Sequence, residues 1–380
     1  MFNNVDTSTS PPNTPRTLRG AGVPGLPGLV RAVLVSLVAA LLVSAPGVAP
    51  ASAESPAGGA PSVRTAKIAS SRVGFDLVNT NNSSVLCLPL PDGKGHRVRG
   101  RLVGPKSVLS GRDAVVTINV LVHDAGTGGW FFNLRSNPTY DYARQLAERG
   151  QTSLVLDRLG YDRSPLKDGQ ATCLGAQVHM LHEVVQHLYA GRFDYLGSRS
   201  GATAPHASHV VLQGHGTGAT IAQLEAARFD DVDALVLMAP TTTSPSQVAL
   251  DIARGQAQTC LTATFAPYGD TSADYRKALF RTAPRAVRRA AVHRRNPTPC
   301  GDVASLPAAL ASSVMGDRDV EMPVLVLRAG ADARRSGGTV AVTSKEKITR
   351  ATFKGAGSAL TLEKAAPKVQ RTVVRWLRTL

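Results

Sequence analysis

A glycine-rich turn, Gly214–Gly218 (GHGTG), is the first candidate for a chemical site in the sequence. An apolar run before it, 209–213, predicts a buried strand, and the pattern after it, 217–229, predicts a helix. As G-x-G-x-x-A, the turn also matches a dinucleotide-binding fingerprint. That fingerprint belongs to the first strand–helix unit of its fold and needs an acidic residue at the end of the second strand. Here three predicted strands precede the turn and the next strand ends in Leu-Met-Ala-Pro, so no nucleotide cofactor is expected.

Histidines and cysteines form no recognisable metal-ligand pattern. The chain contains no C-x-x-C pair, which argues against a zinc site and against a thioredoxin-type motif. Three histidines lie on one predicted helix, which should pack outside the sheet and away from the strand ends: His179, His182 and His187. Three others lie close to the glycine-rich turn without forming a ligand set: His206, His209 and His215. We therefore expect neither a metal nor a cofactor.

Strand and helix patterns alternate along most of the chain. Continuous apolar runs predict buried strands at 114–123, 153–157, 209–213, 234–239, 324–327 and 348–353, after a first strand at 96–104. Helices are predicted at 140–150, 175–190, 217–229 and from about Pro367 onward. This alternation predicts an α/β fold with a mostly parallel, doubly covered sheet, its core formed by 96–243 and 313–380. Residues 244–312 lack strand signals, so we expect a helical cap insertion over the strand ends.

These segments together resemble the α/β-hydrolase superfamily, and most of all its secreted esterase- and lipase-type serine hydrolases from actinobacteria. The turn Gly214–Gly218 stands where that fold has its G-x-S-x-G nucleophile elbow. His123–Gly126 (HDAG) occupies the place of the oxyanion loop, and Asp157–Ser164 (DRLGYDRS) resembles the D-R-x-G-x-G-x-S segment. Asp332 follows a strand where the acid of the catalytic triad is expected, and Ser358 stands where the family has its histidine. The resemblance covers the whole predicted core.

The resemblance implies ester hydrolysis, but two of the three triad positions hold residues that cannot perform it. Acyl transfer needs an oxygen or sulfur nucleophile and a base that takes its proton. The nucleophile position is Gly216, which has no side chain, and the base position is Ser358, whose hydroxyl cannot accept a proton near neutral pH. Only Asp332 matches the family. Glycine at the elbow keeps the turn and removes its backbone strain.

The oxyanion loop departs from the family as well. The resemblance places Asp124 and Ala125 in this loop, and gives the backbone N–H of Thr217 a place in the relic oxyanion hole. Asp124 stands where the family has glycine, so a negative charge would face the developing oxyanion. Thr217 could instead be a displaced nucleophile, although its side chain should point away from the elbow. We therefore expect an inactive hydrolase that binds a ligand or an anionic surface; the alternative is an active esterase with a non-standard mechanism.

The start of the chain has the features of a secretory signal. Three arginines precede the apolar run 32–45, and Ala51–Ala53 (ASA) is a small-residue cleavage site. We predict a signal peptide over 1–53 and a secreted protein that starts at Glu54; an uncleaved anchor is the alternative, although the run is short for a membrane span. Residues 54–95 are rich in Ser, Pro, Gly and Asn, and we expect an extended lead-in there.

Four cysteines follow the predicted signal. An even number in an exported protein favours two disulfides, for which three pairings exist, and four free buried thiols are the alternative. We pair Cys260 with Cys300, because both bound the predicted cap, and Cys87 with Cys173 by remainder.

The composition excludes global disorder and points to a basic surface. Of 380 residues, 43% are hydrophobic and 18% charged, and the net charge is +16. Between 276 and 295 the sequence is Arg-rich and has no acidic residue. Four arginines fall at helical spacing there: Arg281, Arg285, Arg288 and Arg289. Such a face could bind anionic lipid or a cell-wall polymer, or it could be a solvated face; without interleaved aromatic residues we expect no specific nucleic acid, and we expect a monomer.

Overall fold

The computed structural model describes residues 67–111, 116–241, 243–315, 320–337, 342 and 344–380. The predicted signal peptide, 1–53, lies outside the described residues, as does the first part of the predicted lead-in. None of the helices in the described part is both long enough and apolar enough to cross a membrane.

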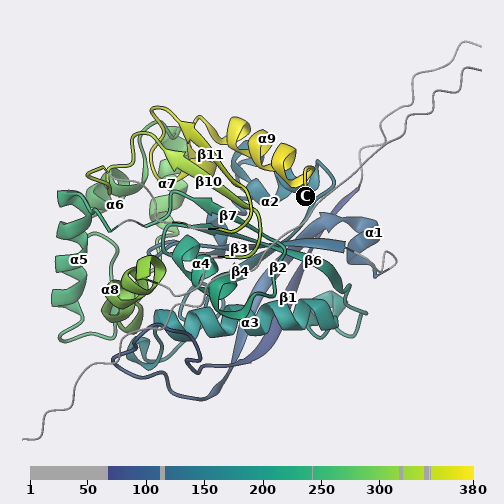
Figure 1. The fold of residues 1–380 in the computed structure, drawn as a ribbon, viewed down its shortest axis with the longest axis horizontal. Coiled ribbons are helices and arrows are strands. Elements are labelled where there is room, and N and C mark those ends of the chain that lie inside the picture. The colour runs from purple at the N-terminus through teal and green to yellow at the C-terminus, as the bar shows by residue number, and fades with distance from the viewer. Residues whose placement is uncertain (1–66, 112–115, 242, 316–319, 338–341, 343) are drawn as a thin grey trace, which may run out of the picture. The chain divides into compact units, whose positions relative to one another are not determined.

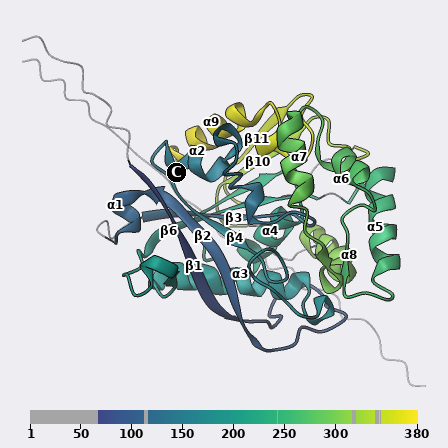
Figure 2. The same ribbon diagram turned by 180° about the vertical axis from the view of Figure 1, so that it is seen from behind.

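The described residues form one nine-stranded sheet with helices on both faces (Figures 1 and 2). Its strands are β1 (Ile68–Val78), β2 (Gly95–Pro105), β3 (Val116–Val122), β4 (Thr152–Asp157), β5 (Asp194–Leu196), β6 (Ala207–His215), β7 (Ala234–Met238), β10 (Val324–Ala329) and β11 (Ile348–Phe353). They lie in the order β11-β10-β7-β6-β3-β4-β2-β1-β5. From β11 to β4 all neighbours are parallel, whereas β2, β1 and β5 join antiparallel. The predicted fold class, an α/β-hydrolase fold with a mostly parallel, doubly covered sheet, is confirmed.

The helices divide between the two faces of the sheet and one end of it, as Figure 1 shows. The core helices are α1 (Lys106–Leu109), α2 (Tyr142–Ala147), α3 (Leu174–Ala190), α4 (Thr217–Phe229) and α9 (Ala366–Leu377). Five short 3-10 turns, at 129–131, 138–140, 169–171, 197–199 and 360–362, join these elements. The segment between β7 and β10 holds α5 (Gln247–Thr259), α6 (Ser272–Leu279), α7 (Arg285–His293), α8 (Cys300–Met315) and a small hairpin of β8 (Phe265–Ala266) and β9 (Thr298–Pro299). We call this helical segment the cap.

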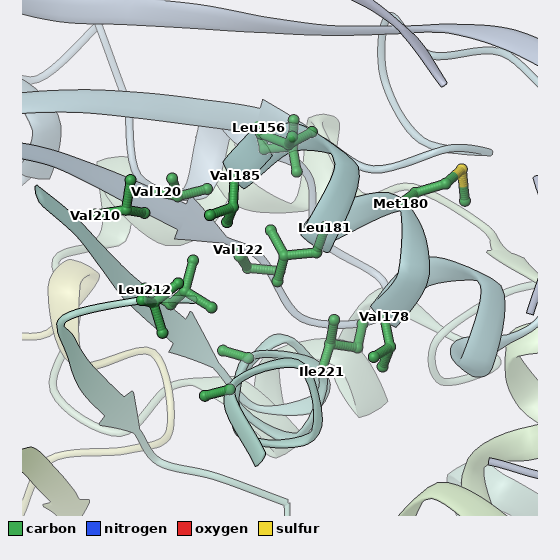
Figure 3. Packing of buried hydrophobic residues seen from close by; sticks show 14 of the residues in the cluster. Val120, Val122, Leu156, Val178, Met180, Leu181, Val185, Val210, Leu212 and Ile221 are labelled. Carbon is green, nitrogen blue, oxygen red and sulfur yellow. The ribbon is translucent and has the colours of Figure 1, made fainter. Parts of the chain in front are cut away.

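Alternating side chains of the central strands fill two separate hydrophobic cores. Val120 and Val122 of β3 pack with α3 and α4 on one face, for example against Leu181 and Ile221 (Figure 3). Leu121, between them in sequence, belongs to the core on the other face, together with residues of α2 and α9. Since both faces are covered, these strands are continuous apolar runs, which is why the sequence predicts them well.

The strand predicted at 96–104 is present as β2, but it is not the first strand of the sheet. The structure has an earlier strand, β1, which pairs with β2 along its whole length. Residues 54–95 are therefore not wholly an extended lead-in. The strand signal is a two-residue alternation in which Val73, Phe75 and Leu77 are buried, each at most 1% exposed. Because residues 54–95 are mostly polar in composition, this alternation was not recognised as a strand signal.

Both predicted disulfides are present. Cys87 pairs with Cys173, with a Cα–Cα distance of 5.9 Å, and Cys260 pairs with Cys300, with a Cα–Cα distance of 5.5 Å. The first joins the segment after β1 to the start of α3, and the second joins the end of α5 to the start of α8. A bridge between residues 40 positions apart should stabilise the fold by about 3–4 kcal/mol through the entropy of the unfolded chain.

The four arginines of the cap do not all lie on one helix, which corrects the predicted spacing. Pro284 precedes α7, so the helix starts at Arg285, and Arg281 lies in the loop before it. Arg281, Arg285 and Arg289 are exposed, and Arg288 is half-buried. A basic surface is present, but a loop and a helix share it.

Candidate functional site

The turn between β6 and α4 has the backbone of a nucleophile elbow. Gly216 has φ of +55° and ψ of −121°, a conformation that residues with a side chain adopt only with strain. A Cβ atom on Gly214 would overlap the backbone of Gly218, and a Cβ atom on Gly218 would overlap the backbone of Val122. The glycines thus permit the close approach of helix and strands, and no side chain stands at the apex.

The carboxylate of Asp124 fills the oxyanion hole. Its Oδ1 atom accepts hydrogen bonds from the backbone N–H of Thr217, at 2.7 Å, and of Ala125, at 2.8 Å. In this fold the donors for the oxyanion are the N–H after the nucleophile and an N–H of the loop after β3. A Cβ atom on Gly216 would overlap the same carboxylate. One side chain therefore occupies both the anion site and the space next to the missing nucleophile.

Arg334 joins this carboxylate to Asp332, the residue at the predicted position of the triad acid. Its Nη1 atom lies 2.6 Å from Oδ2 of Asp124. Its Nε and Nη2 atoms lie 3.2 and 3.3 Å from the two carboxylate oxygens of Asp332. The Arg334 side chain is 8% exposed, and those of Asp124 and Asp332 are 1% and 2% exposed. Arg334 was not among the site residues predicted from the sequence, where its one signal was its position two residues after the predicted acid.

Ion pairing outweighs burial in this network. Burial by itself would raise the pKa of Asp124, but Arg334, His215 and the N–H of Thr217 bring that pKa below its usual value. Burial would likewise lower the pKa of Arg334, but Asp332, Tyr268 and Asp124 hold that pKa well above its usual value. Asp124 and Arg334 are therefore both charged at neutral pH, although both side chains are largely buried.

The base position holds a buried serine that contacts a histidine of the elbow. Nε2 of His215 lies 2.9 Å from the carbonyl oxygen of Ser358 and 3.2 Å from its Oγ. The His215 ring stacks on Phe131, with ring centroids 4.3 Å apart. Burial lowers the pKa of His215 to about 4, so the ring is neutral near pH 7. With its proton on Nε2, His215 donates a hydrogen bond to the backbone carbonyl of Ser358.

The structure brings most of the predicted site residues into one place. Gly216, Ala125 and Thr217 surround the carboxylate of Asp124, and Asp332 joins them through Arg334. Ser358 contacts the ring of His215, whose Nδ1 lies 3.8 Å from the carboxylate of Asp124. Within the described part of the chain, no hydrogen bond connects the Thr217 hydroxyl to a base. Thr217 thus contributes its backbone N–H, and the geometry does not favour it as a nucleophile.

The Asp157–Ser164 segment is a second buried polar group near the site. The Ser164 hydroxyl donates to the carbonyl oxygen of Asp157, at 2.6 Å, and accepts from the N–H of Arg99, at 2.8 Å. Burial, and the nearby Asp162, raise the pKa of the Asp157 carboxyl to about 7. Asp157 therefore titrates close to physiological pH, in contrast to Asp124.

A cavity of about 480 Å³ adjoins the Asp124–Arg334 pair, between the strand ends and the cap. Its walls are mainly apolar side chains of α5 and α8, among them Ile252, Val303 and Leu306. Cavities of this size hold small organic molecules in many proteins. The site thus combines a pocket for a ligand with catalytic positions that are blocked.

One group in the described part of the chain has the composition of a metal site. Ligand atoms of His182, Glu225 and Asp231 all lie within 4.8 Å of one another. Nδ1 of His182 is 2.7 Å from the Asp231 carboxylate. Burial, and the neighbouring Asp231, raise the pKa of Glu225 well above its usual value. Neither carboxylate oxygen of Glu225 has a hydrogen-bond partner among the described residues. None of the three residues lines the cavity, so this group lies apart from the candidate site.

Comparisons with known proteins agree with this architecture. A profile described as the alpha/beta hydrolase family matches residues 120–368. The fold is similar to a monoacylglycerol lipase from Paleococcus ferrophilus, with 18% identity and a TM-score of 0.50 over 68% of this chain and 93% of that one. It is also similar to a hydrolase from Pseudomonas aeruginosa, with 16% identity and a TM-score of 0.50 over 78% of this chain and 98% of that one.

A further similarity is to a solved structure of the metagenome-derived lipolytic enzymes LipS and LipT, with 12% identity and a TM-score of 0.51 over 72% of this chain and 100% of that one. No curated protein matches this chain in sequence. At such identities the solved structures show the fold alone. The family profile covers well over half of the chain, and the chain belongs to the alpha/beta hydrolase family.

Proposed function

We propose that this protein is a secreted, non-catalytic member of its family that binds a small molecule in the cavity under the cap. The single observation that carries the proposal is the position of Asp124, whose carboxylate accepts hydrogen bonds from the N–H groups of Thr217 and Ala125. An oxyanion would need these two donors, and an ionised carboxylate cannot share them with a second anion. Gly216 and Ser358 supply neither a nucleophile nor an imidazole.

Asp124 is itself a poor nucleophile. A carboxylate attacks through a free lone pair, yet Oδ1 of Asp124 is held by two N–H groups and Oδ2 by Arg334. The same contacts lower the pKa of Asp124, which stabilises the charge that an attack would consume. The alternative, an esterase with a non-standard mechanism, would therefore have to break this network before any chemistry.

The cavity supports the binding part of the proposal. Its volume of about 480 Å³ and its largely apolar walls suit an apolar molecule of modest size. The solved structures of similar fold include a monoacylglycerol lipase and lipolytic enzymes, so the ligand we propose is a lipid-like small molecule. The two disulfides agree with an exported protein, and the signal predicted over 1–53 would direct the export.

The exposed arginines of the cap supply a second part of the proposal. Arg285 and Arg289 project from α7 into solvent, and Arg281 is exposed beside them. No acidic residue lies between 276 and 295 to neutralise them. We propose that this basic surface docks on anionic lipid or on a cell-wall polymer, while the cavity holds the ligand.

Hydrolysis of p-nitrophenyl acetate and p-nitrophenyl octanoate tests the central part of the proposal. The purified protein should release p-nitrophenol no faster than the same protein after heat denaturation. The variants Asp124→Asn and Asp332→Asn should leave that background rate unchanged, because neither residue takes part in turnover. A clear rate for the wild type that either variant abolishes would overturn the proposal, since the network would then be a working catalytic group.

A further inference from the structure

We propose that the end of the cavity at the Cys260–Cys300 disulfide is a subsite for an uncharged head group that both donates and accepts a hydrogen bond. The inference rests on the proposed function, because it concerns the ligand of the same cavity. Three buried polar atoms there have no hydrogen-bond partner: Nε2 of Gln256, Oγ1 of Thr298 and Oδ1 of Asp302. Their residues are 6%, 2% and 3% exposed. All three line the cavity.

The disulfide brings these three residues to one end of the cavity. Gln256 lies one helical turn before Cys260 on α5, and its carbonyl accepts the hydrogen bond of the Cys260 N–H at 2.9 Å. Thr298 stands two residues before Cys300, and Asp302 two residues after it, in the first turn of α8. The Cα atoms of the two cysteines are 5.5 Å apart. The polar atoms therefore gather around one covalent link.

Unpartnered polar atoms in a buried wall indicate a group that is missing from the site. Native proteins pair almost all of their buried polar groups, because desolvation without a partner is unfavourable. Gln256 offers an N–H donor, Asp302 offers an acceptor oxygen, and the Thr298 hydroxyl can serve either way. A hydroxyl group or a carboxamide can satisfy a donor and an acceptor at once. Three such atoms beside the apolar walls of α5 and α8 thus specify the polar end of a ligand.

Asp302 already has a cationic partner in Arg158, so the head group need not be a cation. Its other oxygen, Oδ2, accepts hydrogen bonds from Nη1 of Arg158 and from the hydroxyl of Tyr161, both at 3.0 Å. Arg158 and Asp302 are each 2% exposed and form a buried ion pair. A carboxylate head would face Oδ1 of Asp302 and be repelled, whereas a neutral head would gain a hydrogen bond.

The rest of α8 sets the shape of the ligand body. Val303, Leu306 and Leu310 continue along the cavity wall from Asp302 at helical spacing. From Asp302 to Leu310 a helix rises about 12 Å, at 1.5 Å per residue. The subsite therefore suits an alkyl alcohol or alkyl amide of medium chain length, with its head at the disulfide and its chain along α8.

Calorimetric titration with four probes of one chain length tests this assignment: octanol, octanamide, octanoate and octane. We expect octanol and octanamide to bind at least about tenfold more tightly than octanoate and octane, as one or two buried hydrogen bonds would require. The variants Gln256→Met and Thr298→Val keep the volume of each side chain and remove its polar atom. Both should reduce the preference for octanol over octane at least severalfold while retaining octane binding.

A control variant and the melting temperatures of the variants distinguish a wrong subsite from a wrong binding function and from a loss of folding. Leu306→Met changes an apolar part of the wall, so it should affect all four probes alike. If all four probes bind equally and Gln256→Met and Thr298→Val change nothing, the subsite is wrong, whereas the proposed binding function stands. If no probe binds to the folded wild type, the proposed function fails with it. Unchanged melting temperatures of the two polar variants would show that a loss of preference is not a loss of folding.

Discussion

Nη1 of Arg334 lies 2.6 Å from Oδ2 of Asp124, and the two residues are 210 positions apart in the sequence. Arg334 comes from the loop after β10 and Asp124 from the loop after β3, and β7 and β6 separate these strands in the sheet. Because parallel strands end at the same edge, both loops meet over the elbow. A guanidinium thus contacts Asp332, where the family would place an imidazole, and it also neutralises the carboxylate in the oxyanion hole.

Removal of Arg334 should strongly destabilise the protein. Arg334→Gln would leave the carboxylates of Asp124 and Asp332 buried without their cation, and loss of one partner of a buried pair costs about 3–5 kcal/mol. Without Arg334, burial would raise the pKa of Asp124, so the buried carboxylate would be more unfavourable at pH 8, where it is charged, than at pH 5. The variant's loss in free energy of unfolding should therefore be larger at pH 8 than at pH 5. Urea unfolding at both pH values measures this. Arg254→Gln, in an exposed ion pair with Asp251, is the control and should cost less than about 1 kcal/mol. A deficit as small as that of the control would contradict the prediction.

A serine at the elbow position should destabilise the protein and leave it inactive. Gly216→Ser places a side chain at positive φ and against Asp124, which should cost at least about 1–3 kcal/mol. Gly150→Ser is the matched control, because Gly150 also has positive φ, +85°, but faces open space. Gly216→Ser should lower the free energy of unfolding more than the control does. The added loss should be smaller when Gly216→Ser is introduced into Asp124→Gly and compared with Asp124→Gly alone. Equal losses for both serines would mean that Asp124 does not occupy this space.

Restoration of the triad should depend on Arg334. The combination of Gly216→Ser, Ser358→His and Asp124→Gly supplies a serine, a histidine and Asp332, but Arg334 still binds Asp332. We expect p-nitrophenyl acetate hydrolysis to stay at background in this triple variant and to rise only when Arg334→Ala is added. Hydrolysis that is already as fast in the triple variant would show that Arg334 does not prevent Asp332 from orienting the new base.

Asp157 should make stability fall between about pH 4 and pH 8. Its pKa is about 7 in the folded protein, above the ordinary value of 3.8, so the folded state prefers the neutral carboxyl. The stability present below pH 4 is lost as the pH rises through 7, by up to about 4 kcal/mol. Asp157→Asn, which stays neutral, should therefore gain stability relative to the wild type at pH 8 and not at pH 4. The exposed Asp270→Asn serves as control, and thermal unfolding at the two pH values gives the comparison; parallel curves for wild type and Asp157→Asn would refute the shift.

Binding to anionic vesicles should depend on the arginines of the cap and on salt. Neutralisation of four cap residues should abolish most binding to phosphatidylglycerol vesicles, at about 1 kcal/mol per charge. Those residues are Arg281, Arg285, Arg288 and Arg289. Wild-type binding should also fall steeply between low and physiological salt. Four exposed cations on α9 and directly after it form a charge-matched control: Lys368, Arg371, Arg375 and Arg378. An equal loss for both quadruple variants in a vesicle sedimentation assay would point to net charge instead of a docking surface.

Much of the fold could be predicted because its signals are local. Strands buried on both faces are apolar runs, and the glycines of the elbow are needed by the backbone itself, as φ of +55° at Gly216 shows. The disulfide Cys260–Cys300 followed from the position of the cap, which is also a matter of order along the chain. β1 was not predicted because its alternation of buried and exposed side chains is short and lies within a polar segment.

The family, the sheet and the residue types at Gly216 and Ser358 could be read from the sequence, because they depend on residue identities at fixed points of a motif. Neither residue can act as a nucleophile or as an imidazole base. Which side chains surround these two positions depends on the tertiary structure. That Asp124 would enter the oxyanion hole, that Arg334 would bridge it to Asp332, and that Gln256 and Asp302 would gather at one disulfide all depend on loops and helices distant in the chain. Such contacts leave no periodic or local pattern, because they are set by the convergence of parallel strand ends and by the packing of the cap.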